Sequence, residues 1–278
     1  FVGLLANWTH VPVLAFDFAS DPINPWPNNI RSVLFYIHLA LTSGPGGAGR
    51  AGAIFVLGDS EGTLVTTQTM MTLFDDTLRL QAGYGASLTQ PDTWLAGVIL
   101  SSPALDVSCS TPSMDSNCFN FSGDPNAVPT TAHTGTGDPD TGGDCAAMAA
   151  PGATIAEQGA AFKRWCKWTY LPYFFGLEGL ASANTVEEAD AFWYSHRAFF
   201  NLPTVNPLHA GAAELVNLPP FLMFAGTRDM YYSDAASLGT LMCQHGVDVE
   251  VYNAVGAYHD FIEYSLGCGG GYPMLEAV

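Results

Sequence analysis

Short apolar runs alternate along the chain with longer stretches of helical periodicity. The apolar runs predict five β-strands, at residues 11–18, 53–58, 95–102, 219–226 and 247–255. Several of these runs are apolar throughout, which is typical of parallel strands that helices cover on both faces. The main helical stretches between them are at residues 30–41, 63–81 and 233–246. This alternation predicts an α/β fold with a doubly wound, mostly parallel sheet flanked by helices.

A long excursion separates the third predicted strand from the fourth. Residues 106–152 are rich in Asp, Thr, Ser, Gly and Pro, which predicts either a functional lid or a surface loop held by disulfide bonds. Residues 155–201 have a helical and aromatic pattern, and such a segment either forms a wall of a substrate pocket or packs into the core. We therefore expect one domain over residues 1–278, with residues 106–201 as an inserted, lid- or cap-like excursion.

The chain is strongly acidic. Its 26 Asp and Glu residues outnumber 8 Lys and Arg, and the formal net charge is −18. Such a surface repels nucleic acid and anionic lipid, so both are excluded as partners. No run of the sequence reaches the ~20 consecutive apolar residues of a transmembrane helix.

The cysteines and two glycosylation sequons predict an oxidising, secretory environment. The sequons begin at Asn7 and Asn120, and the cysteines, which form no C-x-x-C pair, are Cys109, Cys118, Cys145, Cys166, Cys243 and Cys268. We expect a disulfide bond within the first four cysteines and a second between Cys243 and Cys268. The alternative is six buried thiols and two chance sequons. The first interpretation places the protein outside the cell or in the lumen of a secretory compartment or organelle.

A serine lies between two glycines at the end of the second predicted strand. The segment Gly58-Asp59-Ser60-Glu61-Gly62 follows the apolar run and precedes a helical stretch. G-x-S-x-G in this context is the nucleophile elbow, a tight turn that lifts the serine hydroxyl above the edge of the sheet. The helix N-terminus behind the turn offers backbone N–H groups to a developing oxyanion. Ser60 is therefore the candidate nucleophile.

A serine hydroxyl needs a base, and the base needs a carboxylate that fixes its tautomer. Asp229 directly follows the fourth predicted strand and His259 closely follows the fifth, which is the order serine, acid, histidine. Asp234 lies further along and is better explained as a carboxylate at a helix N-terminus. His245 precedes a strand and lies at the wrong edge of the sheet. The other histidines have no comparable position, and no pair has a metal-site spacing.

These motifs together resemble the hormone-sensitive-lipase-like branch of the α/β-hydrolases, also called α/β-hydrolase fold-3. GDSEGTLV resembles the GDSAGG elbow of that family, and VLAFDFASDPINPWP resembles its strand ending in a D-Y-R-L-A-P-like turn. LAGVILSSPALD resembles the strand after the elbow, and residues 218–261 resemble the segment that carries the acid and the histidine. The resemblance implies an esterase that uses Ser60 as nucleophile, Asp229 as acid and His259 as base, without a cofactor.

The sequence departs from the family pattern at three places. The family's His-Gly-Gly-Gly oxyanion loop should precede residues 11–18, and no such loop is present, so we expect a chain that is incomplete at its N-terminus. Glu61 replaces a small residue after the nucleophile. Its backbone N–H is the predicted donor to the oxyanion, whereas its carboxylate opposes the negative charge that develops on that oxyanion. Thr63 stands where a second glycine is usual.

An acidic turn has part of the pattern of a calcium-binding loop. Asp138, Asp140 and Asp144 have suitable spacing, but Gly142 and Ala149 stand where an EF-hand loop needs side-chain ligands. We therefore expect a solvated turn and no metal site.

The predicted activity is hydrolysis of small-molecule carboxylic esters through an acyl-enzyme intermediate. Amides, peptides and lactones stay open as substrates, because the fold does not select among them. The rival hypothesis is a non-catalytic subunit of the same fold that serves binding or assembly with an unknown protein partner.

Overall fold

The computed structural model of the chain describes about two thirds of its residues. These are residues 2–17, 26–44, 51–117, 174–177 and 186–262, together with Glu157, Ala160 and Lys163. Most of the excursion at residues 106–201 therefore lies outside the described residues, and its predicted role as a lid or cap stays a prediction.

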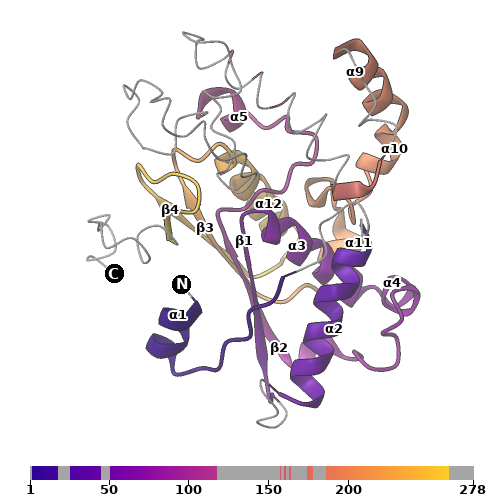
Figure 1. The fold of residues 1–278 in the computed structure, drawn as a ribbon, viewed down its shortest axis with the longest axis vertical. Helices are drawn as coiled ribbons and strands as arrows, with labels where there is room; N and C mark the ends of the chain where they lie inside the picture. Colours follow the sequence, from indigo (N-terminus) through magenta and orange to yellow (C-terminus); the bar gives the residue numbers. More distant parts are fainter. Residues whose placement is uncertain are drawn as a thin grey trace.

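Four parallel strands form the sheet, in the order β1-β2-β3-β4. They are β1 (Ile54–Asp59), β2 (Leu95–Ser101), β3 (Phe221–Gly226) and β4 (Val249–Ala254). Each coincides with a predicted strand to within about two residues. Because neighbours in a parallel sheet end at the same edge, the turns after β1, β3 and β4 meet there (Figure 1).

The strand predicted at residues 11–18 is wrong over its described part. Residues 11–17 form no strand, and most of them are exposed. A strand exists only where a neighbour satisfies its N–H and C=O groups, and within the described sheet β1 pairs only with β2. This segment instead contacts helix α2 (Asn28–Thr42), where the ring of Phe16 stacks on that of Tyr36 at 4.4 Å.

Two helices cover the same face of the sheet. Gly58 of β1 lies directly beneath helix α3 (Glu61–Phe74), and Val251 of β4 contacts Gly239 of helix α12 (Tyr232–Gln244). The strand register places Gly58 and Val251 on one face, through the paired residues Leu100 and Met223. The opposite face carries apolar side chains that are partly or largely exposed, among them Phe55, Phe224 and Tyr252.

Helix α3 is buried along almost its whole length although it contains many threonines. Its hydroxyl groups donate to carbonyl groups one turn earlier, for example from Thr67 to Thr63 and from Thr72 to Gln68. These local hydrogen bonds satisfy the polar groups within the helix. The helix predicted over residues 63–81 is interrupted at Asp75, whose carboxylate caps the N-terminus of α4 (Asp76–Gln81).

Helix α2 packs on α3 (Figure 1). Its buried side chains form an apolar stripe at helical spacing, which consists of Ile30, Val33, Leu34 and Ile37. The remaining described helices are shorter. They are α1 (Val2–Thr9), η2 (Pro91–Thr93), α5 (Ser113–Ser116), α9 (Val186–Ser195), α10 (Arg197–Phe200), η5 (Pro207–His209) and α11 (Ala212–Leu215). Within the described part of the chain, no helix combines the length and apolar composition needed to cross a bilayer.

Candidate active site

Ser60 lies in the sharp turn between β1 and α3. Its backbone has φ 50° and ψ −121°, a conformation that non-glycine residues rarely adopt. The backbone N–H of Ser60 donates to the carbonyl of Ser101 at the end of β2, over 3.0 Å, which ties the turn to the neighbouring strand. The hydroxyl of Ser60 points from this strained turn toward His259.

The three predicted residues meet at the carboxyl edge of the sheet. Oγ of Ser60 lies 2.7 Å from Nε2 of His259, and Nδ1 of His259 lies 2.9 Å from Oδ2 of Asp229. Asp229 is almost fully buried and His259 is 8% exposed, so water competes little for these contacts. The imidazole ring of His259 therefore connects the hydroxyl of Ser60 to the carboxylate of Asp229, as a general base requires.

The turn that carries Asp229 is held from several sides. The other oxygen of Asp229 accepts from the N–H of Tyr231, over 2.8 Å. Asn117 donates from Nδ2 to the carbonyl groups of Thr227 and Asp229, over 3.1 and 3.0 Å. Ser113 donates to the carbonyl of Met230. The described start of the excursion thus contacts the acid turn, a role that its loop-like composition did not reveal.

Carboxylates surround the imidazole ring. Besides Asp229, Asp260 places Oδ1 3.2 Å from Nε2, and Asp59 stands at the end of β1. Burial disfavours a charge on the ring, but Asp229, Asp260 and Asp59 outweigh it and raise the pKa of His259 to about 9. These carboxylates therefore favour the protonated ring, whereas only a neutral ring can accept the proton of Ser60.

Glu61 begins α3 and its side chain is partly buried. Its predicted role as backbone donor to an oxyanion stays a prediction. Sequence reasoning missed Asp260, although it directly follows His259 in the segment Tyr258-His259-Asp260-Phe261. A second acid next to a candidate base was the signal that could have found it.

Asp234 lies in the first turn of α12, as predicted for a helix N-terminal carboxylate. Its carboxylate also accepts from the N–H groups of Leu105 and Asp106 and from the hydroxyl of Thr111. It therefore anchors the loop after β2 to this helix, a role that the sequence did not reveal. Burial and the nearby carboxylate of Asp106 raise the pKa of Asp234 to about 7.

The predicted disulfide bonds are not found among the described residues. Cys243 is an exposed free thiol on the solvent side of α12, so the predicted bond to Cys268 is not present. Cys109 is buried in the core, and its candidate partners Cys118, Cys145 and Cys166 lie outside the described residues. Cys268 and the second sequon, at Asn120, also lie outside them, whereas Asn7 is exposed on α1.

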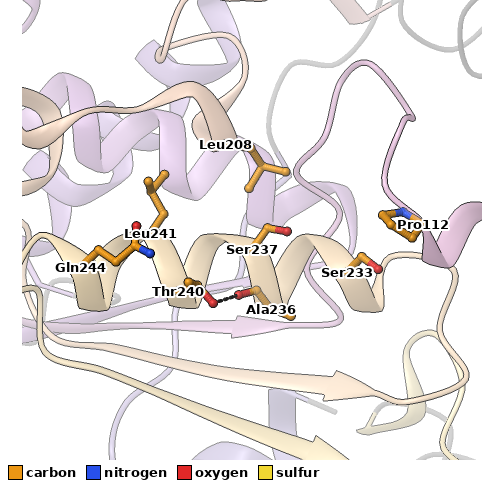
Figure 2. Close-up of a pocket in the computed structure, with 8 residues that line it drawn as sticks. All are labelled: Pro112, Leu208, Ser233, Ala236, Ser237, Thr240, Leu241 and Gln244. Atoms are coloured by element: carbon orange, nitrogen blue, oxygen red, sulfur yellow. Dashed lines mark hydrogen bonds between the residues drawn. The ribbon is translucent and has the colours of Figure 1, made fainter.

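No group of His, Cys, Asp or Glu side chains in the described ranges is arranged to hold a metal ion. The acidic turn with Asp138, Asp140 and Asp144 lies outside these ranges. A groove of about 420 Å³ lies along α12 and contains none of the three site residues (Figure 2). Its polar side chains include Ser233, Ser237 and Thr240, and the hydroxyl of Thr240 donates within the helix to Ala236.

The comparison with protein families agrees with this geometry. Residues 175–263, which include Asp229, α12, β4 and His259, match a family described as alpha/beta hydrolase fold. The chain has the α/β-hydrolase fold. The resemblance to the hormone-sensitive-lipase-like branch is strongest over the same segment. No curated protein matches the chain.

Solved structures show the same α/β-hydrolase fold at low sequence identity. A hyperthermophilic esterase from the archaeon Pyrobaculum calidifontis is 17% identical, with a TM-score of 0.55 over 98% of this chain and 65% of that one. An esterase/lipase from an uncultured bacterium is 16% identical, with a TM-score of 0.56 over 99% and 66%. A hormone-sensitive lipase from a metagenome library is 18% identical, with a TM-score of 0.51 over 94% and 62%. The chain thus spans less than two thirds of the length of these proteins.

Proposed function

We propose that this protein is a serine hydrolase that cleaves carboxylic esters through an acyl-enzyme intermediate. The observation that carries the proposal is the connected series of Ser60, His259 and Asp229, with contacts of 2.7 and 2.9 Å, on a strained turn of an α/β-hydrolase sheet. A chance cluster of polar residues would not combine the buried carboxylate, the bridging ring and the strained serine.

The geometry supports the following sequence of bond changes. In its neutral form, Nε2 of His259 accepts the proton of Ser60 while Oγ bonds to the ester carbonyl carbon. The imidazolium then donates this proton to the leaving alkoxide as the C–O bond breaks, which leaves an acyl group on Ser60. Water repeats the two steps and releases the acid. Asp229 holds the ring and stabilises its positive charge throughout.

We propose small-molecule carboxylic esters as substrates, without a cofactor. The support is the reaction class, since the neighbours named above are called esterases or lipases. The excursion over residues 106–201 is proposed to cover the substrate, because its described part already contacts the acid turn. A secretory or extracellular location is proposed on the sequons alone.

The proposal is tested by ester hydrolysis with the full-length protein. Wild type should hydrolyse p-nitrophenyl esters of short acyl chains, and Ser60→Ala and His259→Gln should each lose at least about a thousandfold in kcat. Ser87→Ala, which changes an exposed hydroxyl on a distant turn, is the matched control and should keep full activity. Equal rates in wild type and Ser60→Ala would contradict the proposal.

One observation favours the second candidate, a non-catalytic subunit used for binding or assembly. Glu61 places a carboxylate directly after the serine, where an esterase needs to stabilise negative charge. A folded full-length protein that shows no hydrolysis and no reaction at Ser60 would support this candidate.

A further inference from the structure

Asp260 is fixed in an unusual backbone position beside the candidate base. Its φ is 55°, in the left-handed region, and its N–H donates to Oγ of Ser102 over 2.8 Å. Ser102 also has positive φ, at 48°, and its own N–H donates to Phe224 of β3. The end of β2 therefore holds the backbone of Asp260 and, with it, the direction of the side chain.

The carboxylate of Asp260 lies at the same side of the His259 ring as Ser60. Oδ1 of Asp260 lies 3.2 Å from Nε2 of His259, and Oγ of Ser60 lies 2.7 Å from the same nitrogen. Asp229 contacts the opposite nitrogen, Nδ1. The imidazole ring is thus held between two carboxylates, whereas the proposed mechanism uses only one.

We propose that Asp260 is a second positioning residue for His259, which stabilises the imidazolium at Nε2 and sets the pH at which the base becomes active. The proposal rests on the proposed function of Ser60, His259 and Asp229. In this role Asp260 acts through its charge alone and exchanges no proton with the ring, while the proton of Ser60 moves to Nε2 and then to the leaving group.

The position of Asp260 has two opposing effects on the reaction. Its negative charge stabilises the imidazolium that forms in each transition state, which favours proton transfer from Ser60. The same charge keeps the resting ring protonated, so less of the enzyme is active at neutral pH. The balance between these effects depends on pH. A residue that only supports the fold would show no such pH dependence when it is replaced.

Other charged or aromatic groups lie around the ring, and the effect of Asp260 on the pKa of His259 must be distinguished from theirs. Asp229 comes from the turn after β3, and Asp59 comes from the end of β1. Tyr231, just before α12, places its ring centroid 5.1 Å from that of His259. Glu61 lies in the first turn of α3, next to Ser60. Asp260 differs from all of these because its oxygen contacts Nε2, where the proton is exchanged.

NMR titration of His259 tests the proposal without reference to activity. In Asp260→Asn the pKa of His259 should fall by about one unit, the shift expected when one nearby carboxylate is removed. Asparagine tolerates positive φ well, so the backbone should be preserved. Asp260→Glu should restore part of the shift, and Asp248→Asn, an exposed carboxylate at the other end of the sheet, is the matched control. An unchanged pKa in Asp260→Asn would overturn the proposal.

The pH profile of kcat/KM gives the second readout. Asp260→Asn should hydrolyse a neutral ester several-fold faster than wild type at pH 7 and several-fold slower above pH 10, because its ring is more often neutral but is a weaker base. Parallel loss at all pH values would show a merely structural role and overturn the proposal. If the pKa falls but neither protein hydrolyses esters, the proposed function fails while the contact of Asp260 with the ring stands.

Discussion

Gly58 and the carbonyl group of Gly62 lie in close contact across the elbow. A Cβ atom on Gly58 would stand 2.5 Å from the oxygen of Gly62 and 2.7 Å from Oγ1 of Thr66. The first of these obstacles is helix backbone, which cannot rotate away as a side chain can. The missing side chain of Gly58 therefore lets α3 start directly over β1, and this contact sets the position of Ser60.

Replacing Gly58 by alanine should displace the elbow. We expect Gly58→Ala to lose about 1–3 kcal/mol of stability, as overpacking commonly costs, together with most of the esterase activity. Gly52→Ala is the matched control, because a Cβ there would meet nothing within 4 Å. Chemical denaturation and ester hydrolysis measure the two effects. Wild-type stability and activity in Gly58→Ala would show that the close contact does not position Ser60.

Asp234 should make stability depend on pH. Its pKa is raised to about 7 in the folded protein, so the folded state holds a proton that the unfolded state releases above pH 4. The contribution of Asp234 to the free energy of unfolding is therefore fully present below about pH 4 and is lost as the pH rises through 7. The pKa of Asp106 is shifted in the opposite direction. Burial raises this pKa, but hydrogen bonds from Ser108 and Ser110 outweigh burial and lower it. The stability that Asp106 contributes is therefore lost only below about pH 4.

Asp234→Asn should remove this pH dependence. The amide can still accept from the N–H groups of Leu105 and Asp106 and can donate to Thr111, so the loop should stay in place. Denaturation at pH 5, 6, 7 and 8 should show that the free energy of unfolding of the wild type falls by at most about 3 kcal/mol over this range, a loss that is absent in the variant. Asp92→Asn, an exposed carboxylate, should behave as wild type. The same slope in Asp234→Asn and wild type would contradict the assignment.

Much of the site could be predicted from local sequence patterns. The glycines around Ser60, the strand before it and the helix after it all lie within about twenty residues, so a local pattern contains the whole elbow. Asp229 and His259 follow apolar strands in a parallel sheet, and the sheet brings the ends of such strands to one edge. The position of Ser60 therefore follows from the elbow pattern, and those of Asp229 and His259 follow from strand order.

The remaining features depend on contacts that no local pattern contains. The segment at 11–17 has the composition of a strand, but a strand also needs a neighbour, and the described sheet provides none for it. Asp234 lies in the first turn of α12 as its sequence position predicts, yet its hydrogen-bond partners lie more than a hundred residues earlier in the chain. The contact of Asp260 with Nε2 requires positive φ, which the sequence does not reveal.

Glu61 offers a test of how charge near the nucleophile affects the reaction. If its carboxylate faces the oxyanion, Glu61→Gln should raise the rate on a neutral ester by about tenfold to a hundredfold, since 1–3 kcal/mol of repulsion is removed. If it binds a cationic group of the substrate, Glu61→Gln should slow only the hydrolysis of a cationic ester, such as a choline ester. Equal rates on both esters in variant and wild type would show that Glu61 faces solvent, where its charge is screened.

Covalent labelling of the full-length protein with a fluorophosphonate asks whether Ser60 is an activated nucleophile. The reagent bonds to a serine only when a neighbouring base takes the proton, so the contact of Ser60 with His259 predicts one adduct, on Ser60. Mass spectrometry of the digested protein should locate it there, and both Ser60→Ala and His259→Gln should lose it while remaining folded. An unlabelled Ser60 in the folded wild-type protein, or an adduct on a different serine, would contradict the proposed function.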